Sequence, residues 1–234
     1  MCGRYVTPKT DGIGELYGVD LVSENLPPRN WNARPSFSLV EPAPPVPVVV
    51  SSEKTGAVTR RLEPAFWSLI PSWARELPRN TFNARSEGAA AAATWRGPLK
   101  SHRAIFPASA YFESQGTGKK AKRYAFQDAD ERVLPLAGLW SWWRETPDAP
   151  WLLTAAILTI ESPNEEVAAI HHRSPLVLTP DLIDPWLDPK ENDGAGLLSV
   201  AVNHAAQRVA GLRHWEVARI EANDEQMLHP VAPG

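Results

Sequence analysis

Proline is spread along the whole chain, and this limits how long its helices and strands can be. The sequence holds 23 prolines among 234 residues, about double the usual ~5%. Because proline lacks a backbone N–H and clashes with the preceding helical turn, it is rarely found inside a helix or a central strand. The sequence therefore predicts many short elements joined by turns rather than a few long helices.

Runs of apolar and β-branched residues mark the expected strands. They lie at 48–50, 57–67, 104–106, 110–113, 123–126, 132–140, 151–161 and 175–179, with late candidates at 197–202 and 215–220. We found no repeat of fixed period and no linker that divides the chain, so we expect a single domain over residues 1–234.

Helices are predicted by propensity and by capping patterns. The alanine-rich run up to Trp95 favours one helix, with Ser86 as its cap. Ser162 and Glu165 have the spacing of a capping box, which predicts a second helix ending near His171. Short helices are also expected at 11–17 and after Thr179, where a proline follows a capping residue.

The charges are distributed unevenly. The net charge of −3 argues against a nucleic-acid-binding protein, but residues 1–123 carry 17 Lys and Arg against 10 Asp and Glu. Between Arg60 and Arg103, eight basic residues alternate with Trp67, Trp73 and Trp95. Guanidinium groups near aromatic rings suit single-stranded nucleic acid. A solvated basic face above core tryptophans is the alternative explanation.

Cysteine usage and hydropathy bear on the compartment. A single cysteine, Cys2, excludes an internal disulfide and is typical of a reducing cytoplasm. The longest apolar run, Trp151 to Ile160, is far shorter than the ~20 residues of a membrane helix. We expect a cytoplasmic, nucleoid-associated protein that has no contact with a membrane.

The position of this cysteine carries the chemical prediction. Removal of Met1 would give Cys2 a free α-amine beside its thiol. Such an amine has a pKa of about 7.7–8.0, so it is far more nucleophilic at neutral pH than a lysine. It can form an imine with an aldehyde, and the thiol can then close a thiazolidine ring. An internal cysteine cannot form this product.

Proton transfer in such a reaction requires acid–base groups. Glu113 ends an apolar strand, where partial burial would raise its carboxyl pKa. His171 or His172 is the second proton carrier, and the apolar stripe of Val167 and Ile170 favours His171 as the buried one. No spacing of Cys, His or carboxylates resembles a zinc site, so we expect neither a metal nor a cofactor.

Six motifs occur in an order and spacing that resemble the SRAP domain, the SOS-response-associated, abasic-site-processing family. They are Met1–Tyr5 (MCGRY), Trp67–Trp73 (WSLIPSW), Asn83–Glu87 (NARSE), Tyr111–Glu113 (YFE), Leu136–Trp140 (LAGLW) and His171–Pro175 (HHRSP). The resemblance covers nearly the whole chain. It implies an α+β fold with a strand-rich, barrel-like core and short peripheral helices.

The resemblance also implies the function and its residues. Proteins of this family shield abasic sites in single-stranded DNA through a thiazolidine crosslink, and they release their own Met1. The activities implied here are crosslinking, autocatalytic removal of Met1 and an abasic-site lyase activity, in a monomer whose partner is single-stranded DNA. The catalytic residues implied are Cys2, Asn83, Glu113 and His171. The DNA-binding residues implied are Arg4, Asn32, Pro35, Trp67, Trp73 and Arg85.

The sequence departs from the family pattern at Ala110, Ser114, His172 and Ser174. All four lie around the predicted glutamate and histidine, so we expect them to affect DNA preference and rate rather than the chemistry of Cys2. Two other functions remain compatible with the sequence. One is an N-terminal-nucleophile cysteine hydrolase or peptidase with His171 as base, and the other is a nucleic-acid-binding module without catalysis.

Overall fold

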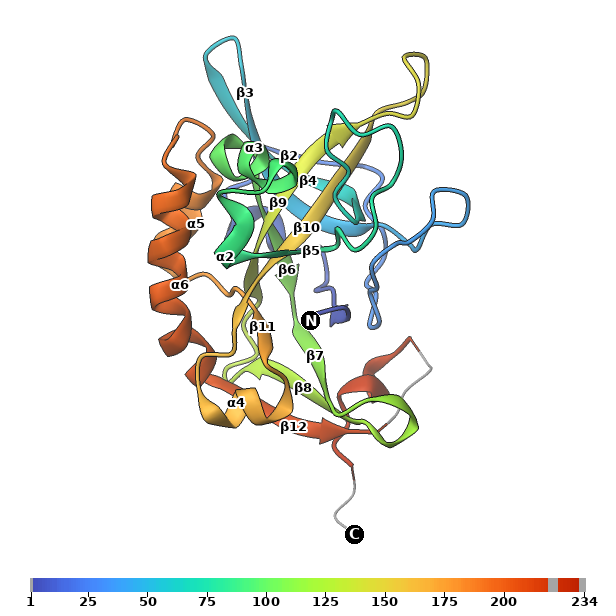
Figure 1. Ribbon diagram of the computed structural model, residues 1–234, viewed down its shortest axis with the longest axis vertical. Helices are drawn as coiled ribbons and strands as arrows, with labels where there is room; N and C mark the ends of the chain where they lie inside the picture. The colour runs from blue at the N-terminus through green and yellow to red at the C-terminus, as the bar shows by residue number, and fades with distance from the viewer. Residues whose placement is uncertain (1, 219–222, 232–234) are drawn as a thin grey trace.

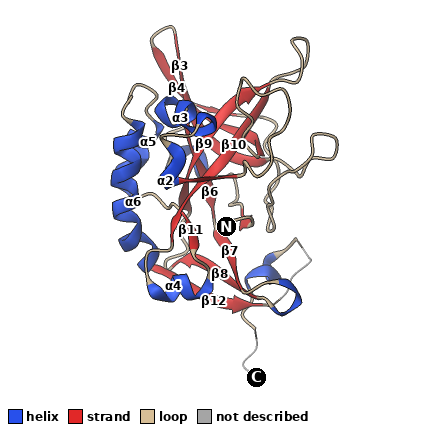
Figure 2. Cartoon of the chain, in the orientation of Figure 1, coloured by secondary structure: helices blue, strands red, loops and turns tan. Residues whose placement is uncertain are grey.

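The computed structural model describes residues 2–218 and 223–231, and within them the chain forms short strands and helices (Figures 1 and 2). The strands are β1 (Tyr5–Val6), β2 (Leu21–Val22), β3 (Val46–Lys54), β4 (Ala57–Trp67), β5 (Asn83–Arg85), β6 (Arg103–Ala108), β7 (Ala110–Gln115), β8 (Lys122–Asp128), β9 (Leu134–Trp143), β10 (Leu152–Glu161), β11 (Arg173–Pro175) and β12 (Leu212–Val217). The helices are α1 (Ile13–Leu16), α2 (Ser86–Ala89), α3 (Ala93–Ser101), α4 (Glu165–Ile170), α5 (Pro180–Leu187) and α6 (Gly194–Ala210).

The larger sheet closes on itself. Its strand order is β11-β10-β9-β6-β3-β4-β2, and β10 also pairs with β4 in parallel, so that β10, β9, β6, β3 and β4 form a ring. Strand β5 adds to β10 with Asn83 opposite Ile157. This mixed fold with a strand-rich core confirms the α+β prediction. The longest antiparallel pairing in this sheet is the hairpin of β3 and β4, which runs from the pair Val46 and Ala65 to the pair Lys54 and Ala57.

The two faces of this sheet bury different cores, as the two-residue period of a strand requires. Val48 and Phe106 belong to one core, whereas their neighbours Val49 and Ile105 belong to the other. Helices α3, α5 and α6 cover the second face, where Leu99, Trp186, Leu198 and other apolar side chains pack (Figure 1). The first face therefore lines the inside of the ring, where the Tyr5 ring packs edge-on against Trp67 and Phe106.

A smaller sheet of order β1-β7-β8-β12 lies at the other end of the molecule, below the ring in Figure 1. Strands β6 and β7 are separated by Ser109 alone, so the chain passes almost directly from the large sheet into the small one. Strand β1 is two residues long and lies at the edge of this small sheet, beside β7. The start of the chain is thereby brought to the junction of the two sheets.

Several sequence predictions about helices and strands are wrong. The alanine-rich segment is not one helix, because Ala92 is extended (φ −71°, ψ 135°) and separates α2 from α3. The cap of α4 is Asn164, whose side chain accepts the Val167 N–H at 2.9 Å, rather than Ser162. Residues 197–202 lie within α6, because Leu198, Ala201 and Ala205 have helical spacing and form its buried stripe.

The hairpins and the helix after Thr179 are confirmed. Ser86, the predicted cap, is instead the first residue of α2, whose N-cap is Arg85. The strand predicted at 175–179 overlaps β11 only at Pro175. Of the predicted strand 215–220, residues 215–217 belong to β12, and residues 219–220 lie outside the described residues. Among the described helices, none has the length and apolarity needed to cross a bilayer.

A buried ion pair joins α6 to the small sheet. Asp128 at the end of β8 is fully buried and accepts hydrogen bonds from Arg132 and from Arg208 of α6, the latter at 2.8 Å. Burial by itself would raise the pKa of the Asp128 carboxyl, but the two guanidinium groups outweigh it and lower the pKa to about 2. The folded protein therefore depends on this carboxylate being charged.

We predict that Arg208→Ala destabilises the protein by about 3 kcal/mol, because it leaves the buried Asp128 carboxylate with only the exposed Arg132 as partner. Arg132→Ala, which removes the exposed arginine, should cost much less, because solvent screens its charge. The contribution of Asp128 should be present above pH ~4 and decline as the pH falls toward 2. Urea denaturation of both variants measures this, and equal losses would contradict the assignment.

Candidate active site

The beginning of the chain is held in the interior of the protein. Tyr5 pairs with Tyr111 of β7 on one side, and on the other side it exchanges two backbone hydrogen bonds with Ala33, at 2.9 and 3.2 Å. Cys2, three residues earlier, has no solvent-exposed surface. Since chain termini usually fray unless they are tied down, this pairing on both sides of β1 explains why residue 2 is ordered.

Asn83 fixes the Cys2 backbone directly. Its side-chain amide donates a hydrogen bond to the Cys2 carbonyl at 2.9 Å. Asn83 itself is 7% exposed and is held in place by the pairing of β5 with β10. Its Oδ1 atom is buried and has no hydrogen-bond partner among the described residues. Asn83 therefore holds the residue at position 2 and presents a buried acceptor beside it.

Glu113 supplies a titratable group at the same place. It lies on β7 two residues after Tyr111, so both side chains are on one face of the strand. Burial raises the pKa of the Glu113 carboxyl to about 7, although the Ser114 backbone N–H opposes the shift. A carboxyl with this pKa can both accept and release a proton near neutral pH.

The pKa of the Cys2 thiol is raised, whereas an activated cysteine nucleophile has a lowered pKa. Burial raises its pKa far above the ordinary value, and the negative charge of Glu113 raises it further. Two buried phenol groups, Tyr5 and Tyr111, feel the charge of a Cys2 thiolate as well, and burial raises the pKa of both. The thiol is therefore protonated at neutral pH until a base takes its proton.

His171 is brought next to Glu113. It follows the last residue of α4 and is extended (φ −153°, ψ 140°), so its ring leaves the helix and lies 3.7 Å from Glu113, from Nδ1 to Oε2. The Arg173 backbone N–H donates to the same Nδ1 at 3.1 Å, and burial lowers the pKa of the imidazole. His172 is exposed. The predicted placement of the two histidines is confirmed, although His171 is not part of the helix.

Side chains behind His171 fix its backbone. The Ser162 hydroxyl donates to the His171 carbonyl at 2.6 Å and lies 2.9 Å from the Ser174 hydroxyl. Because Ser162 has one proton to donate, Ser174 is the donor in this second bond. Ser174, where the sequence departs from the family pattern, is thus a buried part of the support for His171.

Arg173 ties the same segment to the larger sheet. Its guanidinium makes two hydrogen bonds to the Glu87 carboxylate, at 2.7 and 3.1 Å, and a third to the Thr159 carbonyl. Hydrogen bonding from Arg173 lowers the pKa of the Glu87 carboxyl. This two-pronged pair is geometrically specific, so the motifs around Asn83 and His171 are locked together.

The predicted DNA-binding residues are in different environments. Trp67 is 1% exposed, and its indole N–H donates to the Phe82 carbonyl at 2.9 Å. The structure does not support a direct DNA contact by Trp67, because its ring fills the inside of the strand ring. Pro35 is also buried, whereas Asn32 is half-buried and accepts a hydrogen bond from Arg34.

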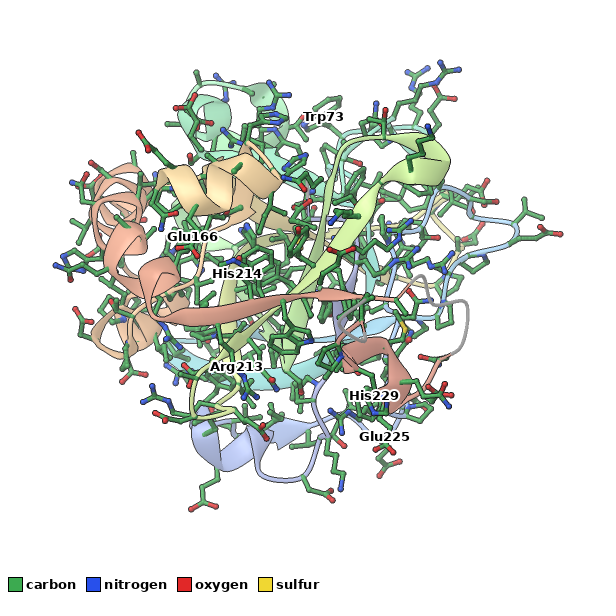
Figure 3. The ribbon with its side chains drawn as sticks, turned by 90° about the horizontal axis from the view of Figure 1, so that it is seen from below. Trp73, Glu166, Arg213, His214, Glu225 and His229 are labelled. Atoms are coloured by element: carbon green, nitrogen blue, oxygen red, sulfur yellow. The ribbon has the colours of Figure 1, made fainter. Side chains whose placement is uncertain are left out.

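The remaining predicted contacts lie at the surface. Arg85 is exposed two residues after Asn83, and Trp73 is 66% exposed. Figure 3 shows Trp73 at the edge of the molecule, on the opposite side of this view from Glu225. Trp73 lines a hollow that contains none of the four predicted catalytic residues.

Arg4 belongs to a cluster of like charges that the sequence did not reveal. Burial, together with the nearby charges of Arg34 and Arg123, lowers the pKa of Arg4 to about 10. Within the described residues, none of these three arginines forms an ion pair with a carboxylate. An uncompensated positive cluster therefore lies beside the first residues of the chain.

Sequence reasoning also missed three aromatic residues. Tyr5 and Tyr111 were noted only as parts of motifs and were given no role. The two-residue spacing between Tyr111 and Glu113 does indicate that these two side chains share a face of the strand. Phe37 gave no signal in the sequence. It is 67% exposed, and its ring packs edge-on against Phe82, the residue before Asn83. Among the described residues, no group of three His, Cys or carboxylate side chains is arranged to hold a metal.

Comparison with known proteins agrees with this geometry. The family model described as "SOS response associated peptidase (SRAP)" matches residues 1–220. The chain is 31% identical over 197 residues to the abasic site processing protein YoqW of Bacillus subtilis, an alignment that covers 82% of this chain and 83% of that protein. It is 30% identical over 189 residues to the abasic site processing protein HMCES of Gallus gallus, covering 68% and 56% of the two chains.

Solved structures share the fold. A crystal structure of a protein from Bacteroides thetaiotaomicron superposes with a TM-score of 0.80 at 19% identity and covers 99% of this chain and 100% of that one. A protein from Bordetella bronchiseptica gives a TM-score of 0.65 at 20% identity, covering 93% and 100%. With the match of the family model over residues 1–220, these findings establish that the chain belongs to the SRAP family.

Proposed function

We propose that this protein processes abasic sites in single-stranded DNA by forming a covalent thiazolidine crosslink through Cys2 after Met1 has been removed. The observation that carries the proposal is the convergence of Asn83 and Glu113 on a buried residue 2, with His171 beside Glu113. The names of the similar proteins, which describe abasic site processing, support the substrate class. Met1 itself lies outside the described residues.

The reaction needs no oxidant or cofactor. The α-amine of Cys2 adds to the aldehyde of the opened deoxyribose, and loss of water from the carbinolamine gives an imine. The Cys2 sulfur then adds to the imine carbon, and the thiol proton ends on the nitrogen of the closed ring. Glu113, with a pKa of about 7, can take the thiol proton and return it. Neutral His171 serves as its proton partner at 3.7 Å.

This order of steps distinguishes the proposal from a cysteine hydrolase. A hydrolase attacks with a thiolate of lowered pKa, whereas burial and Glu113 raise the pKa of the Cys2 thiol. In the proposed reaction the amine attacks first, and the thiol is needed only after the imine has formed. The raised pKa therefore favours crosslinking over hydrolysis. It also fits a lyase side reaction, which would begin from the same imine.

The DNA strand is proposed to reach Cys2 across exposed cationic and aromatic residues. Arg4 and its neighbours Arg34 and Arg123 would contact phosphates, as would the exposed Arg85. Phe37, which packs on the residue before Asn83, offers an exposed face for the base next to the abasic sugar. Asn32 would act by holding Arg34, and Pro35 by shaping the buried side of the same segment.

The proposal is tested by incubating the protein with a single-stranded oligonucleotide that carries one abasic site. We expect an adduct that survives heat and denaturing electrophoresis. Cys2→Ala should lose this adduct but retain an imine that borohydride traps, because its α-amine remains and nothing closes the ring. A heat-stable adduct formed by Cys2→Ala without reduction would show that another residue is the nucleophile.

Glu113→Gln should slow crosslinking by about 10²- to 10⁴-fold, because it removes the group that takes the thiol proton. In the unchanged protein the rate should rise through about pH 7 as Glu113 ionises. Measured across pH 5–9, the variant should keep only the later rise caused by the α-amine.

Protein stability provides a control for this assignment. A carboxyl whose pKa is raised by folding stabilises the fold below the unfolded pKa near 4.5, and this contribution is lost as the pH rises through about 7. Relative to Glu113→Gln, the unchanged protein should therefore lose about 3 kcal/mol of unfolding free energy between pH 4.5 and 8. Identical pH profiles of stability would contradict the raised pKa.

The adjacent histidines give a matched pair of variants. His171→Ala should slow crosslinking by roughly ten- to a thousandfold, because the His171 ring lies 3.7 Å from the Glu113 carboxylate. His172→Ala, which changes an exposed ring, should have little effect. Single-turnover rates on abasic DNA measure both. If only His172→Ala slowed crosslinking, His172 and not His171 would be the proton carrier.

A further inference from the structure

Two adjoining hollows lie at a distance from Cys2, where β9 and β10 meet α3 and the β3–β4 hairpin. Their volumes are about 550 and 480 Å³. Four residues line both of them: His102, Trp140, Trp142 and Trp151. Neither Cys2 nor its catalytic neighbours take part. We refer to the two hollows together as the tryptophan groove.

The walls of the tryptophan groove expose large aromatic surfaces. Trp142 is 36% exposed and Trp151 is 58% exposed, and Trp73 stands at the rim of the first hollow with 66% of its surface exposed. Indole rings of this size are normally buried, and exposed apolar patches on a soluble domain mark binding sites. The groove is therefore suited to a flat ligand that stacks on indole rings.

Trp140 forms part of the wall of both hollows. Its side chain is 1% exposed, and its buried indole N–H has no hydrogen-bond partner among the described residues. Because this N–H has almost no accessible surface, a ligand in the groove would contact the ring of Trp140 and not this donor.

The rim of the groove is cationic. The Arg61 Nη2 atom is buried without a hydrogen-bond partner among the described residues, while its Nε lies 3.4 Å from Glu63. Lys54 and Lys100 are exposed at the rim and form no ion pair within the described part of the chain. The acidic lining residue Glu53 is compensated by Lys190 at 3.9 Å. An anionic group on the ligand would therefore be stabilised.

We propose that the tryptophan groove binds a nucleotide. The base stacks against Trp142 and Trp151, beside the wall formed by Trp140, and the phosphate lies against Arg61 and Lys54. Aromatic rings combined with cations are the usual means of holding unpaired nucleotides. A proline-rich peptide would also suit indole rings, but it would leave the cationic rim without a counter-charge.

The nucleotide can come from two sources. From Leu152, beside the groove, to Ile157, opposite Asn83, β10 runs five residues, or about 17 Å. A nucleotide several positions from an abasic site in the same strand is one source, and a free nucleotide is the other. The groove chemistry does not depend on crosslinking at Cys2, so this inference can fail or succeed separately from the proposed function.

The indole N–H signals in nitrogen–proton NMR spectra test the proposal, with the Trp140 signal assigned from Trp140→Phe. Thymidine 5′-monophosphate and an undamaged eight-nucleotide oligothymidylate should each shift the signals of Trp140, Trp142 and Trp151. Similar affinities per nucleotide would identify a free nucleotide as ligand. A tenfold or greater preference for the oligonucleotide would identify single-stranded DNA.

Two variants separate stacking from charge. Trp142→Ala combined with Trp151→Ala should weaken both ligands by about tenfold or more, whereas Trp215→Phe, which changes a tryptophan on the small sheet, should leave binding unchanged. Arg61→Gln should remove the preference for thymidine monophosphate over thymidine. The spectra of each variant also report whether it remains folded.

Three results would overturn the proposal. These are the absence of a shift at 10 mM nucleotide, shifts that persist in the double alanine variant, or shifts caused by a polyproline peptide but not by nucleotides.

Discussion

A single hydrogen bond, from the Asn83 side-chain amide to the Cys2 carbonyl, holds residue 2 in place beside the other residues of the candidate site. Residue 2 would otherwise be mobile, and a mobile aminothiol gains nothing from an acid–base group fixed elsewhere. Asn83 can make this bond because β5 is paired with β10, and Cys2 can receive it because β1 is held by β7 and by Ala33. The two sheets are thus joined through the predicted nucleophile.

Burial has two consequences at this site. It raises the pKa of Glu113 to about 7, which gives a carboxyl the range of an acid–base catalyst at neutral pH. It also keeps the Cys2 thiol protonated, which would hinder a thiolate nucleophile but is compatible with attack by an amine. His171, whose backbone is held by Ser162, is the second acid–base candidate and lies beside Glu113. The same desolvation therefore favours one reaction class over another.

Much of the fold could be predicted from the sequence, and the failures have physical causes. Strand predictions succeeded where apolar residues alternate or run together, as in β3, β4 and β10. The alanine-rich segment was predicted from propensity alone, which is a weak guide, and it breaks at the exposed Ala92. The sequence from Leu197 looked like a strand because its apolar run is short, whereas the buried stripe extends to Ala205 with helical spacing.

The candidate site was predictable to the extent that motifs carry chemistry. Cys2, Glu113 and His171 were predicted from residue type and position, and Asn83 from the family resemblance. The structure brings these four residues together, and their catalytic roles stay predictions. The resemblance implied that Trp67 binds DNA, but a sequence motif does not report which side of a strand a ring faces, and this ring is 1% exposed. The positive cluster of Arg4, Arg34 and Arg123 was invisible, because its members come from three segments that meet only in the fold.

The central claim is that the Cys2 α-amine, exposed by removal of Met1, is the atom that attacks DNA. Tandem mass spectrometry of the N-terminal peptide from the DNA-adducted protein tests this most directly. The account predicts a deoxyribose remnant on Cys2 of a peptide that has lost Met1, and no adduct on protein that carries an uncleavable N-terminal extension. An adduct on a lysine, or on a peptide that retains Met1, would contradict it.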